Sequence, residues 1–91
     1  MTIAAYMLVQ TRYGKLKIVS SALKKLEEVK ECHEVFGRFD IICKVEVENY
    51  EALKSFMQNK MLILEGIRNT ETLMVYSKVK SNEGVPEEKE S

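Results

Sequence analysis

The spacing of apolar positions changes along the first third of the chain. Residues 3–9 form a nearly continuous apolar run, which is typical of a strand covered on both faces. From residue 15 to residue 28 the apolar side chains recur every three or four positions, which predicts a helix with one apolar face. That face is predicted to carry Leu16, Val19, Ala22, Leu23 and Leu26.

The middle and the end of the chain repeat this alternation. Two further strands are predicted over 29–36 and 39–47, joined by a hairpin turn at Gly37-Arg38 in which glycine supplies a positive φ. Asn49 is a good N-cap for a second helix. A fourth strand is predicted over 67–79. The apolar side of the second helix is predicted to carry Leu53, Phe56, Met57 and Met61.

The predicted order of elements is β-α-β-β-α-β, which defines an α+β fold of the ferredoxin-like type. Right-handed crossovers place both helices on one face of a four-stranded antiparallel sheet. The other face is then left uncovered and would expose an apolar patch, so we expect a dimer built through the sheet. A monomer that tolerates this exposed patch is the alternative. The predicted lining of that face is Tyr6, Leu8, Ile42, Met74 and Tyr76.

Length and charge limit the domain organisation. With 91 residues the chain holds one domain, predicted over 1–80. Residues 81–91 hold four glutamates and one lysine, a charge of −3 that leaves +3 on the rest, and are expected to be an acidic disordered tail. A charge of +3 is too small to predict direct nucleic-acid binding. No membrane span or signal peptide is recognised, so a cytoplasmic location with reduced thiols is expected.

Few residues offer catalytic or metal-binding chemistry. Cys32 and Cys43 lack metal-ligand spacing, and His33 does not complete a zinc site with them, so no metal or cofactor is expected. Neighbouring strand residues point to opposite faces, which argues against a Cys32–His33 catalytic pair. We interpret His33 as a rim or interface residue. Across the predicted turn Cys32 faces Cys43, and two small buried apolar side chains are the favoured interpretation.

Three stretches together resemble the effector-binding domain of the Lrp/AsnC feast/famine regulators. The first strand, "AYMLVQTRYGK", contains a tyrosine and leads into a helix that starts at "GK". "LEEVKECHEVFGRFDIICKVEV" is similar to the family pattern of a helix end followed by a Gly-x-aromatic-Asp hairpin. "EGIRNTETLMVY" resembles the family's last strand. The resemblance covers residues 3 to about 77.

The resemblance implies a small-effector module that does not act as an enzyme. It implies a homodimer formed through the sheet, higher oligomers, and an amino acid bound between dimers near the hairpin and the last strand. The matching positions are Gly37, Asp40, Thr70 and Thr72. The family's regulators usually carry a helix-turn-helix domain first, whereas this sequence starts at the effector domain. We therefore expect a stand-alone module that does not bind DNA itself and could assemble with full-length regulators.

The chemistry of these residues suits an amino acid. The carboxylate of Asp40 can anchor an α-ammonium group through a charge-assisted hydrogen bond. Threonine hydroxyls and glycine N–H groups can receive an α-carboxylate. The alternative is that Asp40 satisfies backbone groups of the turn and that the threonines are ordinary strand residues. Arg38 at the turn tip could pair with the ligand carboxylate or a partner subunit, or stay solvated.

Two other function classes remain open from the sequence. A small dimeric α+β-barrel enzyme would use His33 as a base, and would need His33 in a closed pocket. A purely structural oligomerisation domain would bind no ligand at all.

Overall fold

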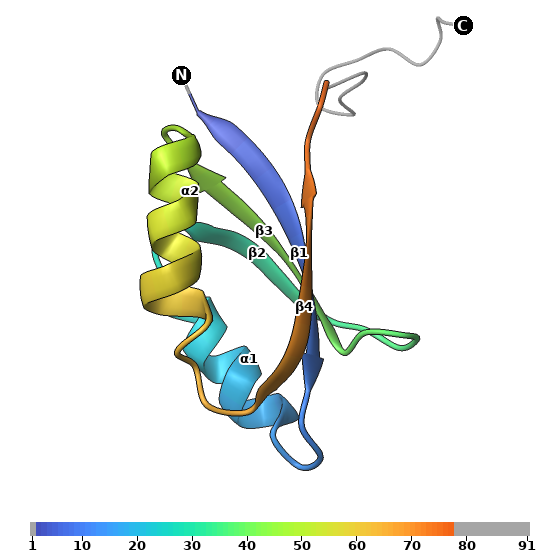
Figure 1. Ribbon diagram of the computed structural model, residues 1–91. Helices are drawn as coiled ribbons and strands as arrows, with labels where there is room; N and C mark the ends of the chain where they lie inside the picture. Colours follow the sequence, from blue (N-terminus) through green and yellow to red (C-terminus); the bar gives the residue numbers. More distant parts are fainter. Residues whose placement is uncertain (1, 78–91) are drawn as a thin grey trace, which may run out of the picture.

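The structure is a computed structural model that describes residues 2–77. It contains a single antiparallel sheet with the strand order β2-β3-β1-β4, and both helical segments cover the same face of that sheet (Figure 1). This arrangement confirms the predicted ferredoxin-like α+β fold. The elements are β1 (Ile3–Thr11), α1 (Leu16–Lys24), β2 (Val29–Glu34), β3 (Ile41–Val47), α2 (Tyr50–Phe56), the π-helix η1 (Met57–Met61) and β4 (Ile67–Met74).

The core lies between the sheet and the helices. Alternate residues of β1 and β3 point to the helix side and are almost fully buried, which matches the period of two expected for a strand. The helices contribute their apolar stripes to the same layer, at three-to-four-residue spacing. The buried cluster consists of Met7, Val9, Val19, Leu23, Ile41, Cys43, Val45, Val47, Leu53, Phe56 and Met61.

The predicted ends of the first helix and of the last strand were wrong, and the predicted start of the second helix was correct. The first helix ends at Lys24, because Lys25 and Leu26 donate hydrogen bonds three residues back and so tighten the last turn. The second helix begins at the predicted cap, where Asn49 Oδ1 accepts a hydrogen bond from Ala52 N at 2.8 Å. The last strand ends at Met74 rather than at Val79, which lies outside the described residues.

Within residues 2–77 no helix or strand covers the face opposite the helices, and we call it the open face. Tyr6, Leu8 and Ile42 lie on it, as predicted. The placement of Met74 on it was wrong, because Met74 pairs with Ala5 and therefore shares the helix-covered side. Leu73 takes its place, since antiparallel pairing sets Leu73 beside Tyr6. Tyr76 lies beyond the end of β4 and is fully exposed.

Two further predictions concern membrane spans and the end of the domain. Within residues 2–77 no helix is long and apolar enough to span a membrane. The predicted domain boundary at residue 80 and the acidic tail over 81–91 lie outside the described residues.

Candidate functional site

The β2–β3 connection is a longer loop than predicted. The strands stop at Glu34 and Ile41, and the connection extends from the sheet on the side away from the helices (Figure 1). Val35 N donates to Asp40 O at 2.9 Å and closes the loop. The N–H of Asp40 does not continue the pairing with β2, because it donates to Val9 O on β1 at 2.9 Å. Gly37 supplies the positive φ, 130°, that was expected at the tip.

The carboxylate of Asp40 is directed at the end of β1. Its Oδ2 accepts hydrogen bonds from Thr11 N at 2.8 Å and from Thr11 Oγ1 at 3.1 Å. Backbone groups of alternate β1 residues face β3, and the β1–β3 ladder ends at the pair Val9–Ile41, so Thr11 N has no strand partner on that side and is available for a side-chain acceptor. In the single chain Asp40 therefore satisfies a backbone group next to the turn and ties the loop to β1.

A depression of about 370 Å³ lies beside this loop. β1 contributes Gln10, whose Nε2 donates to Arg38 O at 2.9 Å and so holds the loop backbone over the sheet. The guanidinium of Arg38 lies over the ring of Phe39, 5.7 Å from its centroid, in cation–π geometry. The full lining of this depression, which we call the loop site, is Gln10, Arg38, Phe39, Asn69 and Glu71.

The loop site brings a positively and a negatively charged side chain together. Within residues 2–77, the guanidinium of Arg38 and the carboxylate of Glu71 form no ion pair. Amide groups of Gln10 and Asn69, which pair across β1 and β4, lie with them in the same lining. The site thus offers a cation, an anion and two amides to a small polar molecule.

The two predicted threonines lie on the other side of the sheet. Thr70 pairs with Val9 and Thr72 with Met7, and both partners belong to the buried core. Thr72 Oγ1 lies 4.0 Å from Met57 Sδ of η1, under the helices. The structure therefore brings Arg38 into the loop site but does not bring Thr70 or Thr72 to it.

Sequence reasoning missed four residues of the loop site, namely Gln10, Phe39, Asn69 and Glu71. The correct β1–β4 register would have placed two of them, Asn69 and Glu71, on the open face. Gln10 follows Tyr6 and Leu8 at the strand period, so it belongs to the open face, and its partner Asn69 shares that face with Glu71.

A larger hollow of about 750 Å³ lies over the other end of the open face. Tyr6, Tyr50 and Tyr76 contribute to its lining together with Lys44, which is 3.6 Å from Glu46. Tyr6, Leu8 and Ile42 on the open face are partly exposed, and we call these three residues the apolar strip. This hollow therefore belongs to the surface for which the sequence predicts a partner sheet.

His33 has no enclosed surroundings. Its side chain is 64% exposed on the edge strand β2, and its Nε2 lies 3.5 Å from Glu31 Oε1. His33 pairs with Ile42 on the open face whereas Cys32 pairs with Cys43 on the helix side, so the two side chains do point apart as predicted. Residues 2–77 do not form the closed pocket that the enzyme alternative requires around His33.

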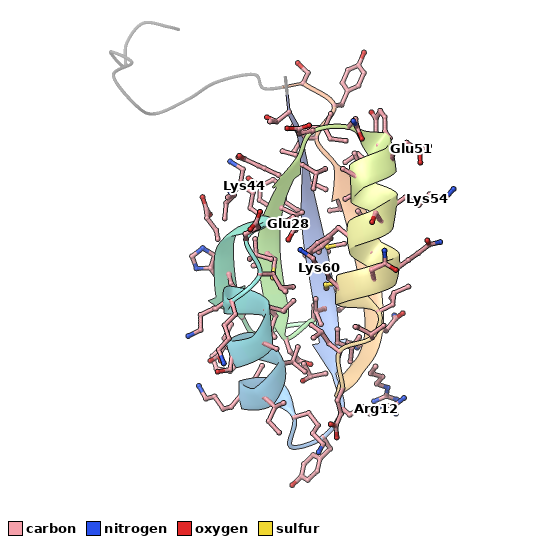
Figure 2. All side chains as sticks on the ribbon, turned by 90° about the vertical axis from the view of Figure 1, so that its left-hand side faces the viewer. Arg12, Glu28, Lys44, Glu51, Lys54 and Lys60 are labelled. Atoms are coloured by element: carbon pink, nitrogen blue, oxygen red, sulfur yellow. The ribbon has the colours of Figure 1, made fainter. Side chains whose placement is uncertain are left out.

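A charged contact fixes η1 to the beginning of β2. Lys60 Nζ donates to Glu28 Oε2 at 2.8 Å, and Figure 2 shows the two side chains turned toward one another from these segments. The hydrogen bond from Lys60 lowers the pKa of Glu28 below its usual value and raises the pKa of Lys60. This contact lies on the helix side and stabilises the fold rather than the loop site.

A sequence model described as the Lrp/AsnC ligand binding domain matches residues 4–85. The chain belongs to the Lrp/AsnC ligand-binding domain family. The family that the hairpin and strand patterns predicted is thereby confirmed.

Relatives of this Lrp/AsnC domain include complete regulators. The leucine-responsive regulatory protein of Klebsiella pneumoniae is 38% identical over 63 residues, which are 69% of this chain and 38% of that protein. The chain therefore spans well under half the length of the curated relatives that it matches. Those relatives are regulatory proteins by name.

Solved structures show the same fold. FFRP-DM1 is 33% identical, with a TM-score of 0.77 and coverage of 80% of this chain and 97% of the other. The transcriptional regulator NMB0573 of Neisseria meningitidis, solved as a complex with L-Met, has a TM-score of 0.81 with 19% identity, covering 92% of this chain and 56% of the other. At that identity the second likeness concerns the fold alone.

Glu34, the last residue of β2, contacts the first helix of this Lrp/AsnC domain. Its carboxylate accepts a hydrogen bond from Lys17 Nζ of α1 at 3.0 Å, and this bond lowers the pKa of Glu34. The polar residue at the end of β2 therefore joins the edge strand to the neighbouring helix.

Proposed function

We propose that this domain binds a free amino acid or a closely related zwitterion at the loop site, as the effector-sensing part of an Lrp/AsnC regulatory system. The observation that carries the proposal is the presence of Arg38 and Glu71 in one depression, each without an ion-pair partner within residues 2–77. The family membership of the chain supports the choice of a small effector.

The charges of the loop site complement the two ends of an amino acid. A guanidinium presents paired N–H donors that match a carboxylate, so Arg38 would receive the α-carboxylate. Glu71 would accept hydrogen bonds from the α-ammonium group. Gln10 and Asn69 can each donate and accept, and would contact the remaining polar atoms.

The residues named from the sequence take different parts in this proposal. Arg38 is a ligand contact, and Gly37 gives the loop the backbone conformation that presents it. Asp40 holds the loop against β1 through Thr11. Thr70 and Thr72 lie on the helix side and are not part of the proposed site.

An L-Met complex of a protein with the same fold supports an amino acid as the ligand class. The loop site is a shallow depression in the single chain, so a second subunit would complete its wall. We propose a homodimer formed through the open face, and higher assemblies that close the loop site. The partly exposed apolar strip on the open face supports this assembly, because water-exposed apolar patches of this kind mark interaction surfaces.

We further propose that the domain modulates transcription through protein assembly, with DNA contacted by other domains or by full-length Lrp/AsnC regulators. The relatives that are named as regulators support this role. Purification of tagged domain from its native source, followed by mass spectrometry, should recover a helix-turn-helix regulator of this family. Recovery of homomeric complexes alone would contradict mixed assembly.

Thermal unfolding against a panel of the twenty amino acids and several metabolic acids tests ligand binding. A ligand that binds only the folded state raises stability by about 2.7 kcal/mol at 100 times its Kd. For a domain of this size that corresponds to a rise in Tm of roughly 10 °C or more. We expect a selective shift for one or a few amino acids.

Variants of the loop site, compared with control variants elsewhere, test where the ligand binds. Arg38→Ala and Glu71→Gln should each abolish the ligand-induced shift. Arg12→Ala and Glu51→Gln, which change exposed residues outside the loop site, should leave it intact (Figure 2). A flat panel for the wild-type protein would contradict the proposal and favour a purely structural oligomerisation domain.

A further inference from the structure

The two cysteines of the domain lie opposite each other on β2 and β3. They form a register pair, and their Sγ atoms are 3.6 Å apart with both thiols free. The bond from Val35 N to Asp40 O marks a hydrogen-bonded position of the β2–β3 ladder, and such positions alternate with non-hydrogen-bonded ones, so the Cys32–Cys43 pair three steps away is non-hydrogen-bonded. In pairs of this kind the side chains approach most closely.

This geometry is compatible with a disulfide. Cα atoms of a non-hydrogen-bonded pair are about 4.5 Å apart, which lies within the range of about 4.4–6.8 Å that a disulfide spans. The Sγ atoms, now 3.6 Å apart, would need to approach by about 1.5 Å to reach bonding distance. Rotation of the side chains and a small movement of the edge strand β2 would supply that approach.

The two thiols differ in access. Cys43 is 1% exposed within the core, and burial raises the pKa of its thiol. Cys32 is partly exposed and lines a cavity of about 240 Å³. The other residues that line this cavity are Lys24, Val29, Lys30 and Glu31. A reagent in solution therefore reaches Cys32 first, and meets two lysines beside it.

We propose that Cys32 is a thiol-modification site for small disulfides that carry carboxylates, and that Cys43 resolves the modified form into a Cys32–Cys43 disulfide. The lysines attract the carboxylates of the reagent, and the cavity has room for the portion of it next to the sulfur. The site lies away from the loop site, and the proposal does not depend on effector binding.

The chemistry takes two exchange steps. Cys32 loses its proton to solvent, and its thiolate attacks one sulfur of the small disulfide, which releases one small thiolate and leaves a mixed disulfide. Cys43 then gives up its proton and attacks Cys32 Sγ, which releases the second small thiolate. Two protein thiols are oxidised and one disulfide is reduced to two thiols. Because Cys43 is buried with a raised pKa, the second step is the slower one.

Glutathione redox buffers of graded composition provide the test on the full chain. Samples are quenched with acid, free thiols are alkylated in denaturant, and intact and peptide masses are measured. Wild-type protein should pass through a glutathione adduct on Cys32 to a form that has lost two hydrogens. Cys43→Ala should stop at the adduct, and Cys32→Ala should stay unmodified while folded and become reactive in denaturant.

A charge control separates the proposed site from general thiol reactivity. Replacing Lys24 and Lys30 together by glutamine should slow adduct formation several-fold at low salt, whereas Lys54→Gln on the outer face of α2 should not change it (Figure 2). The proposal would be overturned by wild-type protein that stays reduced in the most oxidising buffer, by native modification of Cys43 in Cys32→Ala, or by disulfides formed only between chains. If Cys43→Ala fails to fold, faster alkylation of Cys32 than of Cys43 in folded wild type still tests the order.

Discussion

Replacement of Asp40 by alanine tests whether this carboxylate holds the β2–β3 loop in place. Two hydrogen bonds would be lost, both to Thr11, with donor–acceptor distances of 2.8 Å and 3.1 Å. The backbone bonds of residue 40 to Val9 and Val35 would survive, because they do not involve the side chain. The variant thus removes only the contact between the carboxylate and the end of β1.

The expected loss follows from the kind of bond. A hydrogen bond to a charged group contributes about 1.5–3 kcal/mol, and leaving a partly buried N–H unpaired adds to its loss. The second bond shares the same oxygen and comes from a hydroxyl that water can satisfy, so it adds little. We expect Asp40→Ala to lower the free energy of unfolding by about 2 kcal/mol, which is roughly 8–16 °C in Tm for a domain of this size.

Urea unfolding of three variants separates the contributions of the two hydrogen bonds to the free energy of unfolding. Asp40→Asn keeps an oxygen that can accept from Thr11 N, so it should lose less than half as much as Asp40→Ala. Thr11→Val removes only the hydroxyl bond and should lose about 0.5–1 kcal/mol. A loss below about 0.5 kcal/mol for Asp40→Ala, the range of ordinary surface changes, would refute the structural role. Loss of ligand binding without loss of stability would instead identify Asp40 as the ammonium anchor.

Three further predictions concern the scaffold. Asn49→Ala should lower the free energy of unfolding by about 1 kcal/mol in urea titrations, because it removes the N-cap of α2. Gly66→Ala should lose at least about 1–2 kcal/mol by the same assay, because residue 66 has φ 98° and an added Cβ would meet side-chain carbons at 2.9 Å. Gly14→Ala, with φ 78° and open space around it, should lose less, and equal losses would contradict the steric argument. Glu28 has a folded-state pKa below 4.5, so its pairing with Lys60 stabilises the fold above about pH 4.5 and the stabilisation is lost as pH falls through the folded pKa. Glu28→Gln should flatten this part of the acid stability curve, and an unchanged curve would contradict it.

The sequence was sufficient to predict the order of elements and most of the core. Changes in the spacing of apolar residues along the chain locate each strand and helix. A helix cap such as Asn49 is a local signal that neighbouring residues do not alter. The pairing of Cys32 with Cys43 also followed from counting along the hairpin. It held although the loop proved longer, because lengthening a loop symmetrically keeps the register.

The site was harder to predict, because it depends on the pairing of strands that are distant in sequence. Thr70 and Thr72 were assigned from a family pattern, and the β1–β4 register then placed Asn69 and Glu71 on the open face instead. A shift of one residue exchanges every side chain between the two faces. The direction of the Asp40 carboxylate depended on where the β1–β3 ladder ends, at Val9–Ile41, which no local pattern in β1 indicates.

Backbone amide chemical shifts, recorded while amino acids are titrated into the protein, test the central claim most directly. The account predicts saturable shifts that concentrate on the loop site, at Gln10, in the segment from Arg38 to Asp40, and at Asn69 and Glu71, and that disappear in Arg38→Ala. Saturable shifts centred elsewhere in the domain, or the absence of shifts with every amino acid, would contradict it.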